Sequence, residues 1–217
     1  MASLWMPSLG TTSRGEQAGR HVCLYFGSFN PLHRAHLQLA RYMVERALCD
    51  ELWFVLSPLN PLKEGLRPLP FAWRAHYLQQ SIAGDDRLSL CPIEELLPEP
   101  HYTIRTIRAL KMLHPTTSFY LLVGGDNLGL ITKWYAYERL LREVRLYVYP
   151  RPDYPIDEEL LRGLSGDIYI CRDAPGIQLA ATDIRRAALE GVDLREETAC
   201  PELWEELVAQ LRELDTN

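Results

Sequence analysis

The sequence predicts an α/β protein. We expect a Rossmann-like, doubly wound, mostly parallel sheet with helices on both faces and a helical segment at the C-terminus. Two observations predict this fold. Apolar runs of strand length alternate along the chain with amphipathic segments of helical length. Strands and helices that alternate in this way form parallel sheets covered by crossover helices. A length of 217 residues suits one such domain with a substantial core.

Six segments have the apolar, β-branched or aromatic composition of strands. They are residues 22–26, 51–57, 87–91, 117–125, 144–150 and 167–171. The strongest of them is TSFYLLVGG (117–125), because its long apolar run ends in two glycines that favour a turn.

Six further segments carry apolar residues at helical spacing. They are residues 35–48, 71–83, 102–114, 135–143, 182–191 and 201–214. Pro115 stops the third of these helices. Thr182 is placed to cap the fifth, and Gly191 is placed to end it. The last segment provides the expected C-terminal helix.

The first 20 residues have no strand or helix pattern, and we expect a flexible leader there. Residues 21–217 are then expected to form a single domain. Within it, the proline-rich loop 57–70 is longer than a simple connection needs, and long loops in compact domains are often functional. This loop leaves the end of the second strand, where open α/β sheets bind ligands.

Composition narrows the functional classes. A formal charge of −6 argues against nucleic acid polymers as partners, because no overall basic field would attract phosphate backbones. The five cysteines show no C-x-x-C pair or disulfide framework, which indicates a reducing cytoplasm. No apolar run is long enough to span a membrane. The sequence leaves open whether the protein forms a homo-oligomer.

The stretch VCLYFGSFNPLHRAH (22–36) suggests a phosphate site. A strand ends at Gly27, and a short turn leads into a helix that carries His33 and His36. A helix start offers free N–H groups and a positive dipole end, which favour phosphate. Two imidazoles there can donate further hydrogen bonds. The alternative is that both histidines only cap and pack the helix. A metal site is weaker, because no third ligand is obvious nearby.

Several motifs resemble one enzyme family. GSFNPLHRAH (27–36) looks like the GSFDPxHxGH signature of the HxGH nucleotidyltransferases, and LAATDIR (179–185) looks like their ISSTxIR motif. Residues 119–141, 100–103 and 148–155 resemble further segments of nicotinate mononucleotide adenylyltransferases. The matches follow the family's order from residue 22 to about residue 190.

This resemblance implies direct transfer of the adenylyl group of ATP to nicotinate mononucleotide. Pyrophosphate leaves, and the dinucleotide precursor of NAD forms without a covalent intermediate. Catalysis then depends on positioning and on charge stabilisation. Mg²⁺ would arrive with ATP, held more by phosphates than by protein ligands, so no protein metal site is expected.

The resemblance also implies roles for individual residues. His33 and His36 would be catalytic and would hold the phosphates. The expected ATP-binding residues are Gly27, Ser28, Phe29, His33, His36, Gly124, Asp126, Thr182 and Arg185. The expected substrate-binding residues are Tyr102, Thr103, Trp134, Tyr135, Lys63 and Arg151.

Two other functions remain open. One is a related adenylyltransferase whose acceptor is nicotinamide mononucleotide, phosphopantetheine or FMN, although Trp134 argues against the last two. The other open function is a nucleotide-binding protein that has lost turnover, because Ala180 and Ala181 stand where the family has serines. No Asp or Glu adjoins Thr103 or Trp134 in sequence. We therefore expect the acid acceptor to be preferred over the amide.

Overall fold

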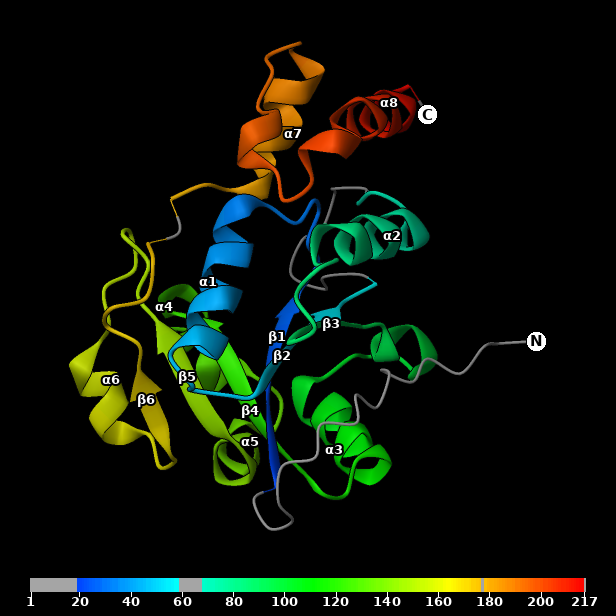
Figure 1. Ribbon diagram of the computed structural model, residues 1–217. Coiled ribbons are helices and arrows are strands. Elements are labelled where there is room, and N and C mark those ends of the chain that lie inside the picture. The colour runs from blue at the N-terminus through cyan, green and yellow to red at the C-terminus, as the bar shows by residue number, and fades with distance from the viewer. Residues whose placement is uncertain (1–18, 59–67, 177, 217) are drawn as a thin grey trace.

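The computed structural model describes residues 19–58, 68–176 and 178–216 (Figure 1). Lys63 and residues 1–18 lie outside the described residues. Arg20 lies within the first strand, so the ordered domain includes this residue of the expected leader.

The centre of the fold is one six-stranded sheet with strand order β3-β2-β1-β4-β5-β6. Its strands are β1 (Arg20–Gly27), β2 (Glu51–Leu56), β3 (Leu88–Cys91), β4 (Thr117–Gly124), β5 (Arg145–Tyr149) and β6 (Ile168–Ile170). All five neighbouring pairs are parallel. The order 3-2-1-4-5-6 is that of doubly wound dinucleotide-binding folds. The predicted fold class is confirmed, and the sheet is parallel throughout its described strands.

Helices cover both faces of this sheet (Figure 1). One face packs on α1 (Arg34–Glu45), α2 (Phe71–Ser81), α7 (Ala181–Leu189) and α8 (Trp204–Asp215). The other face packs on α3 (Thr103–Leu113), α4 (Gly125–Leu128), α5 (Tyr137–Glu143) and α6 (Glu158–Gly163). Side chains along β1 alternate between the two cores, with Cys23 and Tyr25 on the first and Val22 and Leu24 on the second.

The helices differ from the sequence prediction at several places. The predicted helix 135–143 begins only at Tyr137, because Ala136 adopts a left-handed conformation with φ of 53°. The short helices α4 and α6 were not predicted. Asp157 caps α6 by accepting hydrogen bonds from the N–H groups of Glu159 and Leu160. This capping signal was present in the sequence.

The predicted cap of α7 is wrong. The helix starts at Ala181, its N-cap is Ala180, and Thr182 lies inside the first turn. The hydroxyl of Thr182 instead accepts a hydrogen bond from the Arg185 guanidinium at 3.2 Å. The predicted end is confirmed, because Gly191 follows the C-cap with φ of 77°.

A buried arginine fixes the loops that follow β1 and β2. Arg74 of α2 is 1% exposed, and its guanidinium donates hydrogen bonds to the carbonyl oxygens of Leu69, Ser28, Ser57 and Pro58. The planar guanidinium group of Arg74 thus joins both loops to α2. Among the described helices, none is long and apolar enough to cross a membrane.

Candidate functional site

A cavity of about 520 Å³ opens at the carboxyl ends of β1 and β4. These two neighbouring strands mark the point where the strand order reverses, and open α/β sheets bind ligands at such a point. Eleven of the predicted site residues line this cavity: Gly27, Ser28, Phe29, His33, His36, Thr103, Gly124, Asp126, Trp134, Arg151 and Thr182. Arg185, Tyr102 and Tyr135 lie outside the lining.

His33 and His36 form one compact unit at the start of α1. Their rings stack with centroids 3.6 Å apart, and the backbone N–H of His33 donates to Nδ1 of His36 at 3.3 Å. His33 is only 2% exposed, and its Nδ1 finds no hydrogen-bond partner among the described residues. An unmet buried polar atom costs about 1–3 kcal/mol. Such an atom on a cavity wall is one that a ligand can satisfy.

Both imidazoles are held in the neutral form. Burial lowers the pKa of His33 from 6.5 to about 4, and the positive charge of Arg151 adds to the effect. Burial, His33 and Arg151 together hold the pKa of His36 well below its ordinary value. Each ring at neutral pH therefore presents one N–H donor and one acceptor nitrogen. A bound phosphate would favour the protonated form.

Asp126 and Arg151 also line this cavity. The Arg151 guanidinium donates to Oδ2 of Asp126 at 3.1 Å, while Oδ1 of Asp126 is buried and has no partner within the described residues. Gly124 leaves room for this pair, since a Cβ there would lie 2.3 Å from Asp126 Oδ1 and 3.1 Å from Arg151 Cδ. The glycine is thus required by the neighbouring ion pair.

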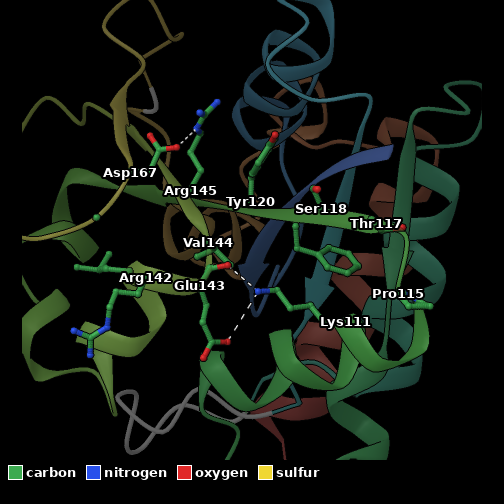
Figure 2. Close-up of a pocket in the computed structure, with 13 residues that line it drawn as sticks. Lys111, Pro115, Thr117, Ser118, Tyr120, Arg142, Glu143, Val144, Arg145 and Asp167 are labelled. Atoms are coloured by element: carbon green, nitrogen blue, oxygen red, sulfur yellow. Dashed lines mark hydrogen bonds and ion pairs between the residues drawn. The ribbon is translucent and has the colours of Figure 1, made fainter. Parts of the chain in front are cut away.

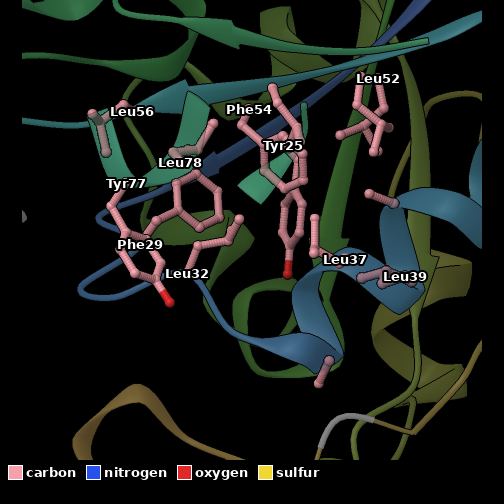
Figure 3. Packing of buried hydrophobic residues seen from close by; sticks show 14 of the residues in the cluster. Tyr25, Phe29, Leu32, Leu37, Leu39, Leu52, Phe54, Leu56, Tyr77 and Leu78 are labelled. Atoms are coloured by element: carbon pink, nitrogen blue, oxygen red, sulfur yellow. The ribbon is translucent and has the colours of Figure 1, made fainter. Parts of the chain in front are cut away.

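The first glycine of the motif has a similar role. A Cβ on Gly27 would lie 2.8 Å from the ring of Phe29. Phe29 has a φ of 39°, is 4% exposed, and packs edge-on against Tyr25 and Phe54 (Figure 3). It also packs edge-on against His36. Phe29 therefore supports the floor of the cavity as part of the core, and its ring also braces His36.

The other end of the cavity is formed by α3 and by the segment before α5. Thr103, the first residue of α3, and Trp134 contribute to the lining. Tyr102 and Tyr135 adjoin these residues in sequence, but their rings stack on each other with centroids 4.3 Å apart. Of the predicted substrate residues, Thr103 and Trp134 thus line the cavity, as Arg151 does, whereas Tyr102 and Tyr135 pack beside it.

The sequence prediction missed a carboxylate at this end. Glu94 lines the same cavity as Thr103 and Trp134, is 2% exposed, and accepts a hydrogen bond from Thr106 Oγ1 at 2.9 Å. Burial raises its pKa, against the opposing hydrogen bonds from Ser57 and Thr106. No Asp or Glu adjoins Thr103 or Trp134 in sequence, but the fold brings the Glu94 carboxylate into the same cavity lining.

The C-terminal motif brings α7 to the cavity. Ala180, Ala181 and Thr182 form part of the wall at the start of this helix. Arg185 does not reach the lining. Its guanidinium donates to the carbonyl oxygen of Asn30 at 2.6 Å, so it ties α7 to the turn after β1. Burial lowers the pKa of this guanidinium.

A second cavity, of about 570 Å³, lies at the opposite edge of the sheet beside the first residues of β4 and β5 (Figure 2). Its cations are engaged by protein groups. Lys111 donates to the carbonyl oxygen of Glu143 at 2.7 Å, and Arg145 binds Asp167 at 2.6 Å. None of the predicted site residues lines it. The cavity with the paired histidines is therefore the candidate active site.

A 3-2-1-4-5-6 parallel sheet with paired imidazoles and helix starts at its carboxyl edge defines a nucleotide-binding α/β protein. Comparison with known proteins gives the family. A cytidylyltransferase-like family model matches residues 24–187. The chain is 45% identical to a "probable nicotinate-nucleotide adenylyltransferase" of Porphyromonas gingivalis over 87% of this chain and 94% of that protein. A relative with the same name from Bacteroides thetaiotaomicron is 34% identical over 89% and 94%.

The chain therefore belongs to the cytidylyltransferase-like family and, within it, to the nicotinate-nucleotide adenylyltransferases. Among solved structures, the Plasmodium falciparum nicotinic acid mononucleotide adenylyltransferase complexed with NaAD aligns with a TM-score of 0.72 over 91% of this chain and 98% of that chain. At 20% identity, this likeness shows the fold alone.

Proposed function

We propose that this chain transfers the adenylyl group of ATP to nicotinate mononucleotide, with nicotinate adenine dinucleotide and pyrophosphate as products. One observation carries the proposal. The buried imidazole pair His33–His36, with its unpartnered Nδ1, shares one cavity with the unpartnered carboxylate oxygen of Asp126. The cavity therefore offers both hydrogen-bond donors for phosphate and an acceptor for hydroxyl groups.

The proposed reaction needs no covalent intermediate with the protein. A phosphate oxygen of nicotinate mononucleotide forms a bond to the α-phosphorus of ATP, and the bond from that phosphorus to the bridging oxygen breaks. Pyrophosphate leaves with the electron pair. His33, His36 and the start of α1 would hold the phosphates in line, where developing charge on oxygen meets fixed donors.

Mg²⁺ enters this proposal together with ATP. The described residues contain no group of three or more His, Cys, Asp or Glu side chains that could hold a metal ion. Asp126 Oδ1 is one free, buried carboxylate oxygen in the cavity and could complete a shell made mostly of phosphate oxygens and water. Bound in this way, Mg²⁺ would offset charge on the leaving pyrophosphate.

Thr103 and Trp134 are proposed to receive the pyridine ring of the acceptor, as a hydroxyl donor and a stacking surface. Glu94 at the same end is the one observation that favours the amide, because a carboxylate accepts hydrogen bonds from a carboxamide and repels an acid. Nicotinamide mononucleotide is therefore the second candidate acceptor. The reaction is assigned to the cytoplasm, since all five cysteines are free thiols.

A pyrophosphate assay tests the proposal. The protein is mixed with ATP, Mg²⁺ and, in separate reactions, nicotinate mononucleotide, nicotinamide mononucleotide, phosphopantetheine or FMN. We expect the acid mononucleotide to give the highest kcat/KM. His36→Ala should lower kcat by about 10²–10⁴-fold, because it removes a positioned group at the reacting phosphate. Near-normal turnover by His36→Ala, or no pyrophosphate from the acid acceptor, would contradict the proposal.

A further inference from the structure

Three side chains form a stack beside the cavity, composed of Tyr102, Arg105 and Tyr135. The two tyrosine rings lie 4.3 Å apart between centroids at an interplanar angle of 18°. The Cζ atom of Arg105 lies 5.0 Å from the Tyr102 centroid and 5.5 Å from the Tyr135 centroid. The guanidinium therefore contacts both rings within the range of cation–π attraction. We call this group the tyrosine–arginine stack.

The tyrosine–arginine stack does not line the cavity, but its two tyrosines adjoin residues that do. Tyr102 stands between His101 and Thr103, which both line the cavity, and Tyr135 directly follows Trp134, which lines it as well. Because each tyrosine adjoins lining residues, the stack joins the two chain segments that form this end. The contacts with both rings hold the exposed Arg105 guanidinium next to these two segments.

Arg105 carries a charge that the described residues do not neutralise. No ion pair or hydrogen bond joins its side chain to another described residue. One turn further along α3, Arg108 forms a two-pronged ion pair with Glu143 at distances down to 2.5 Å. Aromatic rings attract a cation without cancelling its charge. Arg105 therefore presents a free positive charge, whereas Arg108 does not.

The free charge of Arg105 is relevant because the described lining of the cavity contains no unpaired lysine or arginine. Arg151 is the one lysine or arginine there, and it is paired with Asp126 at 3.1 Å. The fixed acidic group at the end beside the stack is Glu94. A second carboxylate entering this end would meet Glu94 without a lining cation to offset it. The cation of the tyrosine–arginine stack is placed to supply that offset.

We propose that Arg105 is a specificity-determining residue that favours a pyridine ring bearing a carboxylate over one bearing a carboxamide. The inference rests on the proposed function. The reacting phosphate of a mononucleotide must lie near His33 and His36, so its pyridine ring extends toward the opposite, α3 end of the cavity. The charge of Arg105 attracts the carboxylate there and acts only weakly on the neutral amide.

The test compares kcat/KM for nicotinate and nicotinamide mononucleotide in wild type, Arg105→Gln, Arg105→Lys and the control Arg108→Gln. Arg105→Gln should lower kcat/KM for the acid about 3–10-fold and leave the value for the amide within about twofold, since a partly exposed charge contributes modestly. Arg105→Lys should retain most of the preference. Arg108→Gln should behave as wild type, because Glu143 occupies its charge.

Raising the salt concentration is the second arm of the test. The acid preference of the wild type should shrink between low and high ionic strength, and that of Arg105→Gln should change little, because salt screens exposed charges. An equal loss for both acceptors in Arg105→Gln would show that the stack only braces the cavity and would overturn the proposal. Unchanged kcat/KM for both would overturn it as well.

Calorimetric binding separates this inference from the proposed function. If the wild type releases no pyrophosphate with either mononucleotide, the proposed function fails. The affinities of wild type and Arg105→Gln for the two mononucleotides still decide the role of Arg105. A loss of about 3–10-fold confined to the acid supports its role, and equal affinities in both proteins contradict it.

Discussion

At the candidate active site, the protonation state and hydrogen bonding of individual residues depend on the groups packed around them. His33 and His36 are ordinary imidazoles whose burial and mutual stacking keep them neutral. Gly124 leaves space for the Asp126–Arg151 pair, because a Cβ at this position would collide with Asp126. Two of the unpartnered buried polar atoms, His33 Nδ1 and Asp126 Oδ1, belong to residues that line the cavity. These unpartnered atoms are the groups to which a bound nucleotide would form hydrogen bonds.

The lowered pKa of His33 predicts an acid-sensitive stability. In the unfolded chain the imidazole binds a proton near pH 6.5, but in the folded protein only near pH 4. The unfolded state therefore takes up more protons in this window, and stability falls as pH decreases from 6.5 toward 4. His33 alone should account for about 2 kcal/mol of loss between pH 7 and pH 5.

Urea unfolding of wild type and His33→Gln at pH 7 and pH 5 measures this contribution. The variant should lose about 2 kcal/mol less than wild type over that interval. His76→Gln, which replaces an exposed histidine of α2, is the matched control and should follow wild type. An identical pH dependence in His33→Gln and wild type would mean that His33 is not held neutral by burial.

At the scale of elements, the site depends on how helix starts are fastened to the loops after β1 and β2. Arg185 joins α7 to the turn after β1 through the carbonyl oxygen of Asn30. On the other side of that turn, Asn30 Oδ1 accepts the N–H of Leu69 at 3.0 Å. Arg74 adds bonds to the loops after both strands. Polar ties of this kind hold α1 and α7 at fixed places around one cavity.

The fastening of α7 predicts unequal effects of two substitutions on ATP affinity. Ala181→Ser adds a hydroxyl to the cavity wall and should tighten ATP binding by about 1 kcal/mol, or about fivefold. Arg185→Ala should weaken it by tenfold or more, at ~1.4 kcal/mol per factor of ten, because the charge and the bond to Asn30 are both lost.

Isothermal titration with ATP and Mg²⁺ checks both effects. The control is Arg186→Ala, whose exposed guanidinium is paired with Asp183 at 2.9 Å on the same helix. It should leave ATP affinity as in wild type. If Arg185→Ala binds ATP normally as well, the C-terminal motif serves only to pack α7.

At the scale of the whole molecule, the cavity is where the two halves of the sheet and both helical layers meet. Its lining draws on β1 and β4 in the centre, on α1 and α7 from one face, and on α3 from the other. Segments far apart in the sequence, such as the start of α1 and the start of α7, form adjoining walls. A ligand in this cavity therefore contacts helices from both faces of the sheet.

Ligand binding is thus expected to raise the stability of the entire domain. ATP at about 100 times its Kd should add about 2.7 kcal/mol to the free energy of unfolding, because it binds only the folded state. For a chain of this size that corresponds to a rise in Tm of roughly 5–10 °C. Thermal unfolding monitored by circular dichroism, with sulfate at matched ionic strength as control, measures the shift. An unchanged Tm at saturating ATP would contradict nucleotide binding in this cavity.

Patterns along the chain are sufficient to predict the mostly parallel α/β architecture and the histidines at the start of α1. Apolar period, chain-breaking residues and turn chemistry are local properties that can be read along the chain. The helix α6 was also within reach, because Asp157 is a strong capping residue followed by a short apolar pattern. The start of α7 was not, because the N-cap alanine makes no side-chain bond that a sequence pattern could indicate.

The tertiary structure brings together side chains that are distant in sequence. It paired Arg151 with Asp126, placed Glu94 in the same cavity as Thr103, and stacked Tyr135 on Tyr102. Each contact depends on strand order and register, which set the positions of the strand ends relative to one another. No local pattern contains that information. The charges around the cavity therefore follow from the sheet that brings those strand ends to a common edge.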